Sequence, residues 1–288
     1  MKEHIHVIQA LTDLFQFQFW RYAIAGGLAI ALVCSVLSVY VVLRRMAFIG
    51  QGISHAAFGG IALGIYFFAG TAHAILGIYA TALAFCLVVA WLIAATTRES
   101  RVSEDSAIGI FFVVAMALGV IFFKAARGYN QDAMSYLFGS VLALTRTDLW
   151  LIYGLGTLVL VPLILFQKQL LYYCFDMQMA EVSGVPVRFL HYLLLTLITI
   201  TIVISVRLVG IILVSAFLVL PGATAHLLAR RFAGMLGASV LLGLGTTLLG
   251  LVISCVTDLP AGATIVLIQF AVFLVVFALH RLRYRHVA

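Results

Sequence analysis

Among the side chains of this sequence, the imidazole of His55 is the strongest candidate for binding a metal ion or a proton. It lies within a segment, from Met46 to Thr97, that contains no Asp, Glu, Lys or Arg. Ionisable side chains in membrane-embedded segments are costly and usually mark a transport pathway or a proton relay. A neutral imidazole binds Zn²⁺ and, less tightly, Mn²⁺ or Fe²⁺. His55 is therefore a candidate contact for a metal ion or proton; the structural alternative is a hydrogen bond to a neighbouring Ser or Thr.

Gln51 precedes His55 by four residues, so the two side chains share one face of a helix. Counted from Arg45, the imidazole lies about 15 Å along a helix axis, near the middle of a bilayer. Small residues on a neighbouring face would let another helix approach closely. They are Ala56, Gly60 and Gly64. Gln51 and His55 together form the candidate metal contact.

The composition predicts that these residues lie in a membrane protein. The chain of 288 residues is 65% hydrophobic and 9% charged, with a mean hydropathy of +1.20. The surface of a soluble globular protein cannot be built from such a sequence. The four cysteines, Cys34, Cys86, Cys174 and Cys255, are widely spaced and do not indicate a disulfide framework.

Charged residues fall between apolar runs that are close to bilayer length, at about 20 residues per crossing. The predicted fold class is all-α: a polytopic membrane helical bundle with about eight to nine transmembrane helices. Residues 1–20 are predicted to form an interfacial segment, and residues 21–288 a single transmembrane domain. The nine spans are predicted at Tyr22–Leu43, Ile53–Ala69, Ala72–Thr96, Ser106–Phe123, Leu149–Phe166, Phe189–Val206, Gly210–Ala229, Ala233–Val256 and Gly262–His280.

Basic residues gather on alternate connections, which the positive-inside rule places in the cytoplasm together with the C-terminus. The formal net charge of +7 is therefore spread over helix ends. There it sets topology and contacts anionic lipid, and it does not indicate nucleic-acid binding.

Two further segments have structural and functional interpretations. Pro221-Gly222 interrupts a predicted span, which indicates either an ordinary kink or freed carbonyls that line a cavity or pack against a partner helix. Residues 175–186 form the longest polar stretch on the cytoplasmic side. They are typical of a short surface helix ended by Gly184 before Pro186, which either docks a partner or serves as a linker.

The chain lacks the signatures of the common membrane enzymes. It contains no G-x-x-x-x-G-K-[ST] sequence, so a P-loop ATPase activity of its own is not predicted. H-E-x-x-H and G-x-S-x-G are absent too, which argues against the usual hydrolases. The chain is predicted to be a transport subunit rather than an enzyme.

Several separated motifs resemble one known family, the membrane permease subunits of bacterial ABC importers for zinc, manganese and iron. The similarity covers nearly the whole chain, and the order and spacing of the motifs are specific. The motifs are Val41–Met46 running into Ser54–Ala56, Met134–Gly139, Asp176–Ala180 running to Gly184-Val185, Val209-Gly210 followed by Leu220–Ala225, and Asp258–Gly262.

This resemblance implies a dimeric permease in the bacterial inner membrane. It implies an extracytoplasmic metal-binding protein that delivers the ion, two cytosolic ATP-binding subunits that drive transport, and no permanently bound cofactor. The family's contact with the ATPase corresponds to a coupling helix near residues 175–186. The residues that carry it here are Asp176, Ala180, Glu181, Gly184 and Val185.

The family characteristically has an acidic residue four positions before the histidine, where this chain has Gln51. A neutral amide should hold a divalent ion less tightly than a carboxylate. Asp132 and Asp258, at the predicted outer mouth, are candidates for attracting cations, although Asp258 also fits an ordinary turn. The leading hypothesis is ATP-driven uptake of a transition-metal ion. The alternative is an ion-coupled secondary transporter that uses His55 as a proton or metal relay.

Overall fold

A computed structural model describes residues 18–71, 74–99, 102–126, 139 and 144–285. Within these residues all regular structure is helical. This described part of the chain holds eleven helices: α2 (Gln18–Leu43), α3 (Ala47–Phe68), α4 (Ala74–Glu99), α5 (Glu104–Ala125), α7 (Arg146–Leu165), α8 (Gln167–Phe175), α9 (Met177–Val182), α10 (Val187–Val209), α11 (Ile211–Leu228), α12 (Phe232–Thr257) and α13 (Ala261–Arg285).

Eight of these helices have the length and apolar composition needed to cross a membrane. The predicted all-α bundle with eight to nine spans is therefore confirmed, and the chain is an integral membrane protein. The helix at the seventh predicted span, α11, has a shorter apolar part, Leu213–Leu228. Helix α8 was not predicted, because its sequence was assigned to the connection after α7. The predicted interfacial segment, residues 1–20, lies outside the described residues except for its last three, which begin α2.

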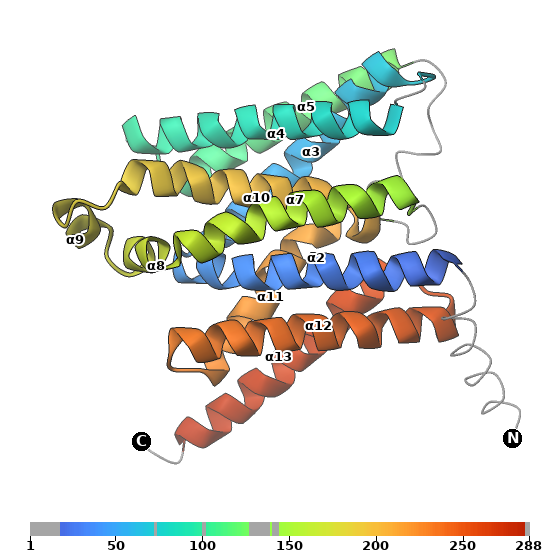
Figure 1. Cartoon of the computed structure of the whole chain (residues 1–288). Helices are drawn as coiled ribbons and strands as arrows, with labels where there is room; N and C mark the ends of the chain where they lie inside the picture. The colour runs from blue at the N-terminus through green and yellow to red at the C-terminus, as the bar shows by residue number, and fades with distance from the viewer. Residues whose placement is uncertain (1–17, 72–73, 100–101, 127–138, 140–143, 286–288) are drawn as a thin grey trace, which may run out of the picture.

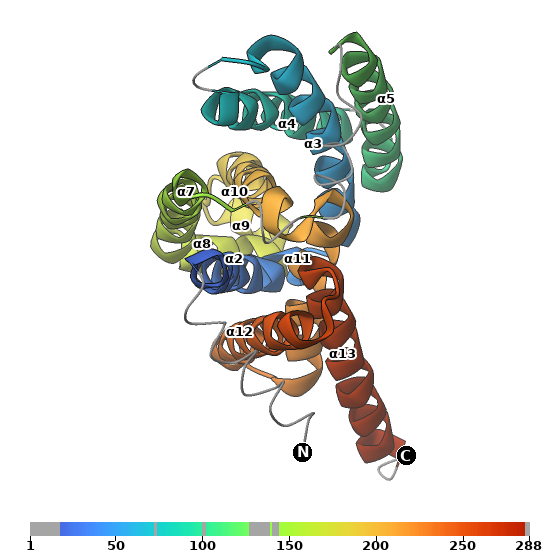
Figure 2. The ribbon, with the colours of Figure 1, turned by 90° about the vertical axis from the view of Figure 1, so that its right-hand side faces the viewer.

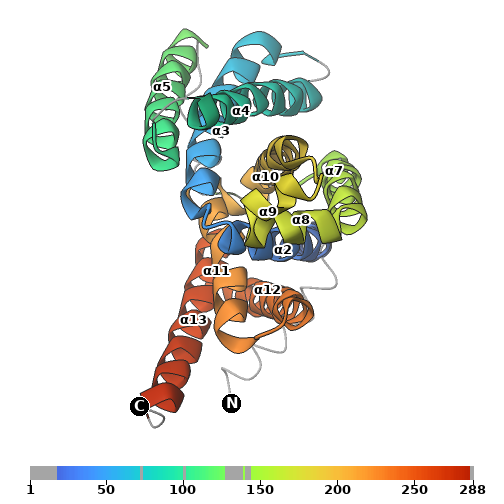
Figure 3. The same ribbon diagram turned by 90° about the vertical axis from the view of Figure 1, so that its left-hand side faces the viewer.

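Helices α2, α4, α7, α10 and α12 run across the molecule in similar directions, and α3, α11 and α13 cross them obliquely (Figure 1). Helices α8 and α9 project at one end of the bundle. We call this the α9 end; the C-terminal end of α13 lies there too. Seen along the bundle, α3, α4 and α5 form one group and α12 and α13 another (Figures 2 and 3). Helices α2, α7, α10 and α11 lie between them. Helix α11 is central, because it packs against α2, α3, α12 and α13.

A tight turn joins α2 to α3. Arg45 adopts the left-handed conformation (φ 58°), and the Met46 N–H donates to the Val41 carbonyl at 3.0 Å. This is the Schellman pattern that ends helices, formed here without the usual glycine. Helix α3 then begins at Ala47, so the predicted start at Ile53 was six residues late. A turn this short leaves no linker between the two helices.

Helix α11 is held to α2 at its proline. The Gly222 N–H, one residue after Pro221, donates to the Ser38 hydroxyl at 2.8 Å, and that hydroxyl lies 3.3 Å from the Val219 carbonyl. A Cβ added at Gly222 would lie only 2.6 Å from the Ser38 carbonyl oxygen. In lipid, backbone groups freed by a proline must find a partner within the protein, and here a serine of α2 supplies one.

The turn between α10 and α11 is equally crowded. Gly210 (φ 89°) reverses the chain, and Gly139 and Gly262 pack directly against it. A Cβ on Gly139 would lie 2.5 Å from the Leu208 carbonyl oxygen, and one on Gly262 would lie 2.6 Å from that of Val209. Because Leu208 and Val209 are fully or almost fully buried, this turn lies inside the protein.

We expect Gly222→Ala to lower the thermal unfolding midpoint of the detergent-purified protein. The added methyl group would collide with the α2 backbone, and such overpacking costs about 1–3 kcal/mol. The matched control is Gly245→Ala in α12, where nothing lies within 4 Å of the added Cβ. This control should be neutral or slightly stabilising, since alanine favours helices over glycine. Equal midpoints for the two variants would contradict the close α2–α11 contact.

Candidate functional site

Gln51 and His55 lie one turn apart on α3, as the sequence predicted. His55 is partly buried, and its ring packs edge-on against Phe112 of α5 with the ring centroids 4.9 Å apart. Gln51 is exposed. The imidazole lies eight residues from the start of α3, about 12 Å along the helix axis. Both side chains therefore belong to the part of α3 that faces α5.

Other faces of α3 pack closely against α4 and α5 through small residues. A Cβ added at Gly60 or Gly64 would lie 2.8 Å from a Cα atom of α4. The small-residue face predicted from the sequence thus receives α4. On the α5 side, a Cβ at Gly59 would lie 2.6 Å from the Ala115 carbonyl oxygen. Helix α3 is held tightly on two sides, and its side chains can meet a mobile ion only where these contacts end.

One such place is a cavity of about 310 Å³ between α3 and α5. Its lining includes an amide and a carboxylate, Gln51 and Asp105, among mostly apolar groups. The lining residues are Phe48, Gln51, Gly52, Asp105, Ile108, Gly109 and Phe112. His55 is not among them, although its ring touches Phe112. The cavity offers oxygen ligands of the kind that hard divalent cations prefer.

The sequence analysis did not predict a role for Asp105. The residue lies in the first turn of α5, after Ser103 caps the helix by accepting from the Ser106 N–H. Acidic residues are common in the first turn of a helix because they interact favourably with the positive end of the helix dipole. The position of Asp105 in the sequence therefore had an ordinary structural explanation. Only the pairing of α3 with α5 brings Asp105 to the cavity that Gln51 lines.

The described residues contain no group of three or more His, Cys, Asp or Glu side chains that could hold a metal ion. A cation at this cavity would therefore meet Gln51 and Asp105, with His55 nearby on the same helix face. Two or three weak ligands suit an ion that passes, because conduction requires binding that is weak enough for release.

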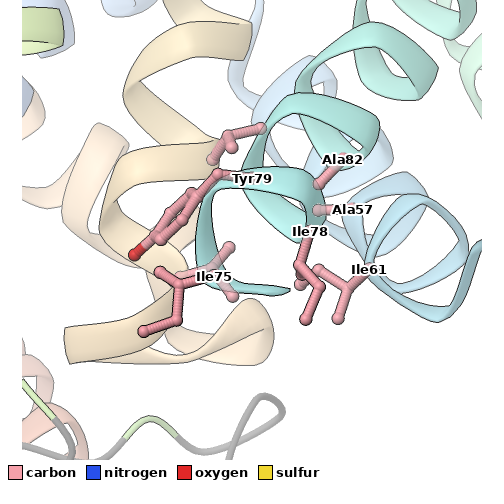
Figure 4. A pocket seen from close by; sticks show the side chains of 8 residues that line it. Ala57, Ile61, Ile75, Ile78, Tyr79 and Ala82 are labelled. Atoms are coloured by element: carbon pink, nitrogen blue, oxygen red, sulfur yellow. The ribbon is translucent and has the colours of Figure 1, made fainter. Parts of the chain in front are cut away.

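A second cavity, on the opposite side of α3, is too small and too apolar for an ion. It measures about 20 Å³, room for roughly one water molecule, and lies between α3, α4 and α10. Figure 4 shows Ala57, Ile61 and Ile78 on its walls, with the Tyr79 hydroxyl reaching away from them. This cavity is a gap in helix packing.

The Tyr79 hydroxyl instead donates to Asp148 of α7 at 3.1 Å. Asp148 is fully buried, and it also accepts hydrogen bonds from the backbone N–H and the hydroxyl of Thr145 at 2.8 Å and 2.6 Å. Sequence reasoning did not single out this carboxylate, although the T-x-x-D pattern is a helix-start signature. With its partners in place, Asp148 ties α4 to the start of α7.

The segment predicted as a surface helix forms α9. Asp176 caps it by accepting from the Met179 N–H at 2.9 Å. Gly184 (φ 79°) ends it, and the Val185 N–H returns to the Ala180 carbonyl at 3.0 Å. These bonds form the Schellman pattern. The predicted helix and its predicted glycine stop are both confirmed, whereas contact with an ATPase remains a prediction.

Helix α9 has one buried residue and an exposed apolar surface. Ala180 is fully buried, while Met179 is 54% exposed and Val182 is 84% exposed; Glu181 is exposed beside them. Exposed apolar patches can mark interaction sites, so this surface is a candidate for docking a partner. The small Ala180 lets α9 sit close to the bundle with this patch turned outward.

The other predicted residues lie apart from the α3–α5 cavity. Pro221 and Gly222 lie inside α11, where the Gly222 N–H bonds to Ser38 of α2, and whether they form a kink or line a pathway stays a prediction. Asp258 caps the C-terminal end of α12 in the left-handed conformation (φ 54°), so it is a turn residue at the end opposite α9. Asp132 lies outside the described residues. A role for either aspartate in attracting cations stays a prediction.

Comparisons with known proteins agree with this architecture. The manganese transport system membrane protein MntC of Halalkalibacterium halodurans is 39% identical over 269 residues, covering 92% of this chain and 88% of that protein. The manganese import system permease protein ScaB of Streptococcus gordonii is 37% identical over 274 residues, covering 94% and 93%.

A solved structure shares the fold over nearly the same length. It is PsaBC from Streptococcus pneumoniae in complex with Fab, which superposes with a TM-score of 0.83 at 34% identity and covers 94% of this chain and 95% of that one. The sequence model of the ABC 3 transport family matches residues 16–280. The resemblance seen in the motifs is therefore confirmed, and the chain belongs to the ABC 3 transport family.

Proposed function

We propose that this chain is the permease subunit of an ATP-driven importer for a divalent transition-metal ion. The observation that carries the proposal is the α3–α5 cavity, where Gln51 and Asp105 place oxygen ligands on an exposed face of otherwise apolar helices. Relatives named for manganese transport support the choice of ion. Mn²⁺ suits carboxylate and carbonyl-type oxygen ligands, whereas Zn²⁺ and Fe²⁺ remain competitors at a nearby imidazole.

The proposed site handles the ion by weak, successive contacts. Gln51 contributes a neutral oxygen, Asp105 a charged one, and His55 a nitrogen one turn farther along α3. None of these groups forms a closed coordination shell by itself. We propose that a second permease copy faces this side of α3 and α5 and completes the passage, as the family resemblance implies.

The α9 end is proposed to face the cytoplasm. Arg44 and Arg45 lie at the α2–α3 turn, Arg188 near the start of α10, and Arg230 and Arg231 between α11 and α12. Cations concentrated on the same side as α9 satisfy the positive-inside rule. The exposed tip of α9 is then placed where a cytosolic ATP-binding subunit can dock, and a metal-binding protein would deliver the ion at the opposite end.

Metal uptake in cells that carry only this permease tests the site. We expect His55→Ala and Gln51→Ala to lower the initial rate of radioactive Mn²⁺ uptake by about tenfold, equivalent to about 1.4 kcal/mol. The control is His226→Ala, which removes a histidine from α11, outside the cavity. Membrane insertion of each variant is checked by immunoblot. Wild-type uptake rates in both α3 variants would exclude these residues from the pathway, and competition by Zn²⁺ or Fe²⁺ would rank the ions.

Capture of the ATP-binding subunit tests the role of α9. We expect Val182→Asp and Gly184→Val to reduce co-purification of the ATPase with the tagged permease by about tenfold. The first change puts a charge on the exposed apolar tip, and the second strains a left-handed position. Lys168→Ala, an exposed change on α8, serves as the control. Undiminished capture by both variants would show that the ATPase docks elsewhere.

A further inference from the structure

A cavity of about 250 Å³ opens behind α9, where the ends of five elements meet. Both signs of charge line it. The lining residues are Arg44, Thr97, Glu104, Met177, Glu181, Val187, Arg188, His191 and Tyr192. They come from the end of α2, from α4 and α5, from α9, and from the start of α10. The cavity therefore lies between the proposed ATPase-docking helix and the spans.

Arg44 connects α2 to α8 and α9. Its guanidinium carbon lies 4.3 Å from the centre of the Tyr173 ring, a cation–π arrangement. One terminal nitrogen, Nη2, reaches the sulfur of Met177, the first residue of α9, at 4.0 Å. Burial raises the pKa of Tyr173 to about 12, so its hydroxyl stays protonated in the 2.8 Å hydrogen bond with His191 Nδ1. The aromatic ring beneath the Arg44 guanidinium is thus held in place by a hydrogen bond to α10.

The guanidinium is nevertheless incompletely satisfied. Arg44 Nε is buried without a hydrogen-bond partner, and so is one carboxylate oxygen of Glu104, Oε1. Among the described residues, these are the only buried orphan atoms that belong to charged side chains. Both side chains line the same cavity, and they lie within electrostatic reach of each other. A buried polar atom left unpaired costs about 1–3 kcal/mol, and more when it is charged.

We propose that Arg44 and Glu104 form a direct ion pair in another state of the transport cycle, when α9 moves. Displacing α9 would shift Met177 and the neighbouring Tyr173, the two groups that hold Arg44 in its present position. The freed guanidinium could then close across the cavity onto Glu104 of α5. The inference rests on the proposed ATP-driven function. In it, Arg44 and Glu104 position the helices and do not themselves touch the ion.

The connections of the two residues explain why such a pair would matter. Arg44 directly follows α2 and precedes the left-handed Arg45, so its position is coupled to the start of α3. Glu104 begins α5, and the next residue is Asp105 on the α3–α5 cavity. Forming the ion pair would draw the ends of α2 and α5 together and so move the walls that contain Gln51 and Asp105.

Charge exchange tests the pair in the reconstituted permease–ATPase complex. The variants are Arg44→Glu, Glu104→Arg and the double exchange, and the readout is metal ions transported per ATP hydrolysed. Each single variant should lower this ratio by about tenfold, within the usual range of coupling energies. The double exchange should restore it to within about threefold of wild type. A double variant no better than the worse single variant overturns the inference.

The matched control is Arg45→Gly. It removes the same charge from the adjacent, exposed position and suits the left-handed backbone. Its transport ratio should equal that of wild type. If the wild-type complex itself transports no metal, the proposed function fails; if it transports and the exchange does not rescue, only the ion pair fails.

Thermal stability separates a transient pair from a permanent structural one. Glu104→Gln removes the orphan charge while keeping the side chain's shape. In nucleotide-free protein, where the pair is not formed, this variant should unfold at the wild-type temperature or above it, yet transport less metal per ATP. A lowered unfolding temperature together with an unchanged transport ratio would assign Glu104 an ordinary structural role and contradict the proposal.

Discussion

The rest of the structure depends on how α11 satisfies its backbone inside a membrane. Pro221 cannot donate a hydrogen bond, and lipid offers none in exchange. The Ser38 hydroxyl accepts from the Gly222 N–H, which is possible because Gly222 brings the two backbones almost into contact. This contact holds α11 against α2 at the centre of the bundle. Helices α3, α12 and α13 then pack on α11.

The candidate functional groups lie on helices outside the α2–α11 contact. Helix α3 has one side on α11 and the others on α4 and α5, so it links the fixed centre to an outer pair of helices. Its glycines let the backbones of α4 and α5 approach closely. The candidate ion contacts lie on α3 and α5, and the α9 cavity touches the ends of α2 and α5. Movement at α9 and opening of the cavity beside Gln51 would thus involve the same helices, α2, α3 and α5.

Local signals in the sequence predicted much of this arrangement. Apolar length located the spans, and Gly184 located the end of α9, because both depend on neighbouring residues only. Pairings between distant segments were harder to predict. Asp105 had an ordinary explanation as a first-turn residue, and nothing near Arg44 in the sequence indicates that it stacks on Tyr173, 129 residues later. The start of α3 was misplaced because an arginine, rather than a glycine, takes the left-handed position.

We expect this chain to move a divalent metal ion only when a separate subunit hydrolyses ATP. The most direct test is Mn²⁺ accumulation in vesicles that contain the purified permease, with and without the ATP-binding subunit, ATP and a pH gradient. The account predicts accumulation only when both the ATP-binding subunit and ATP are present, whether or not a pH gradient is imposed. Accumulation driven by a pH gradient with the permease alone would contradict it and identify a secondary transporter.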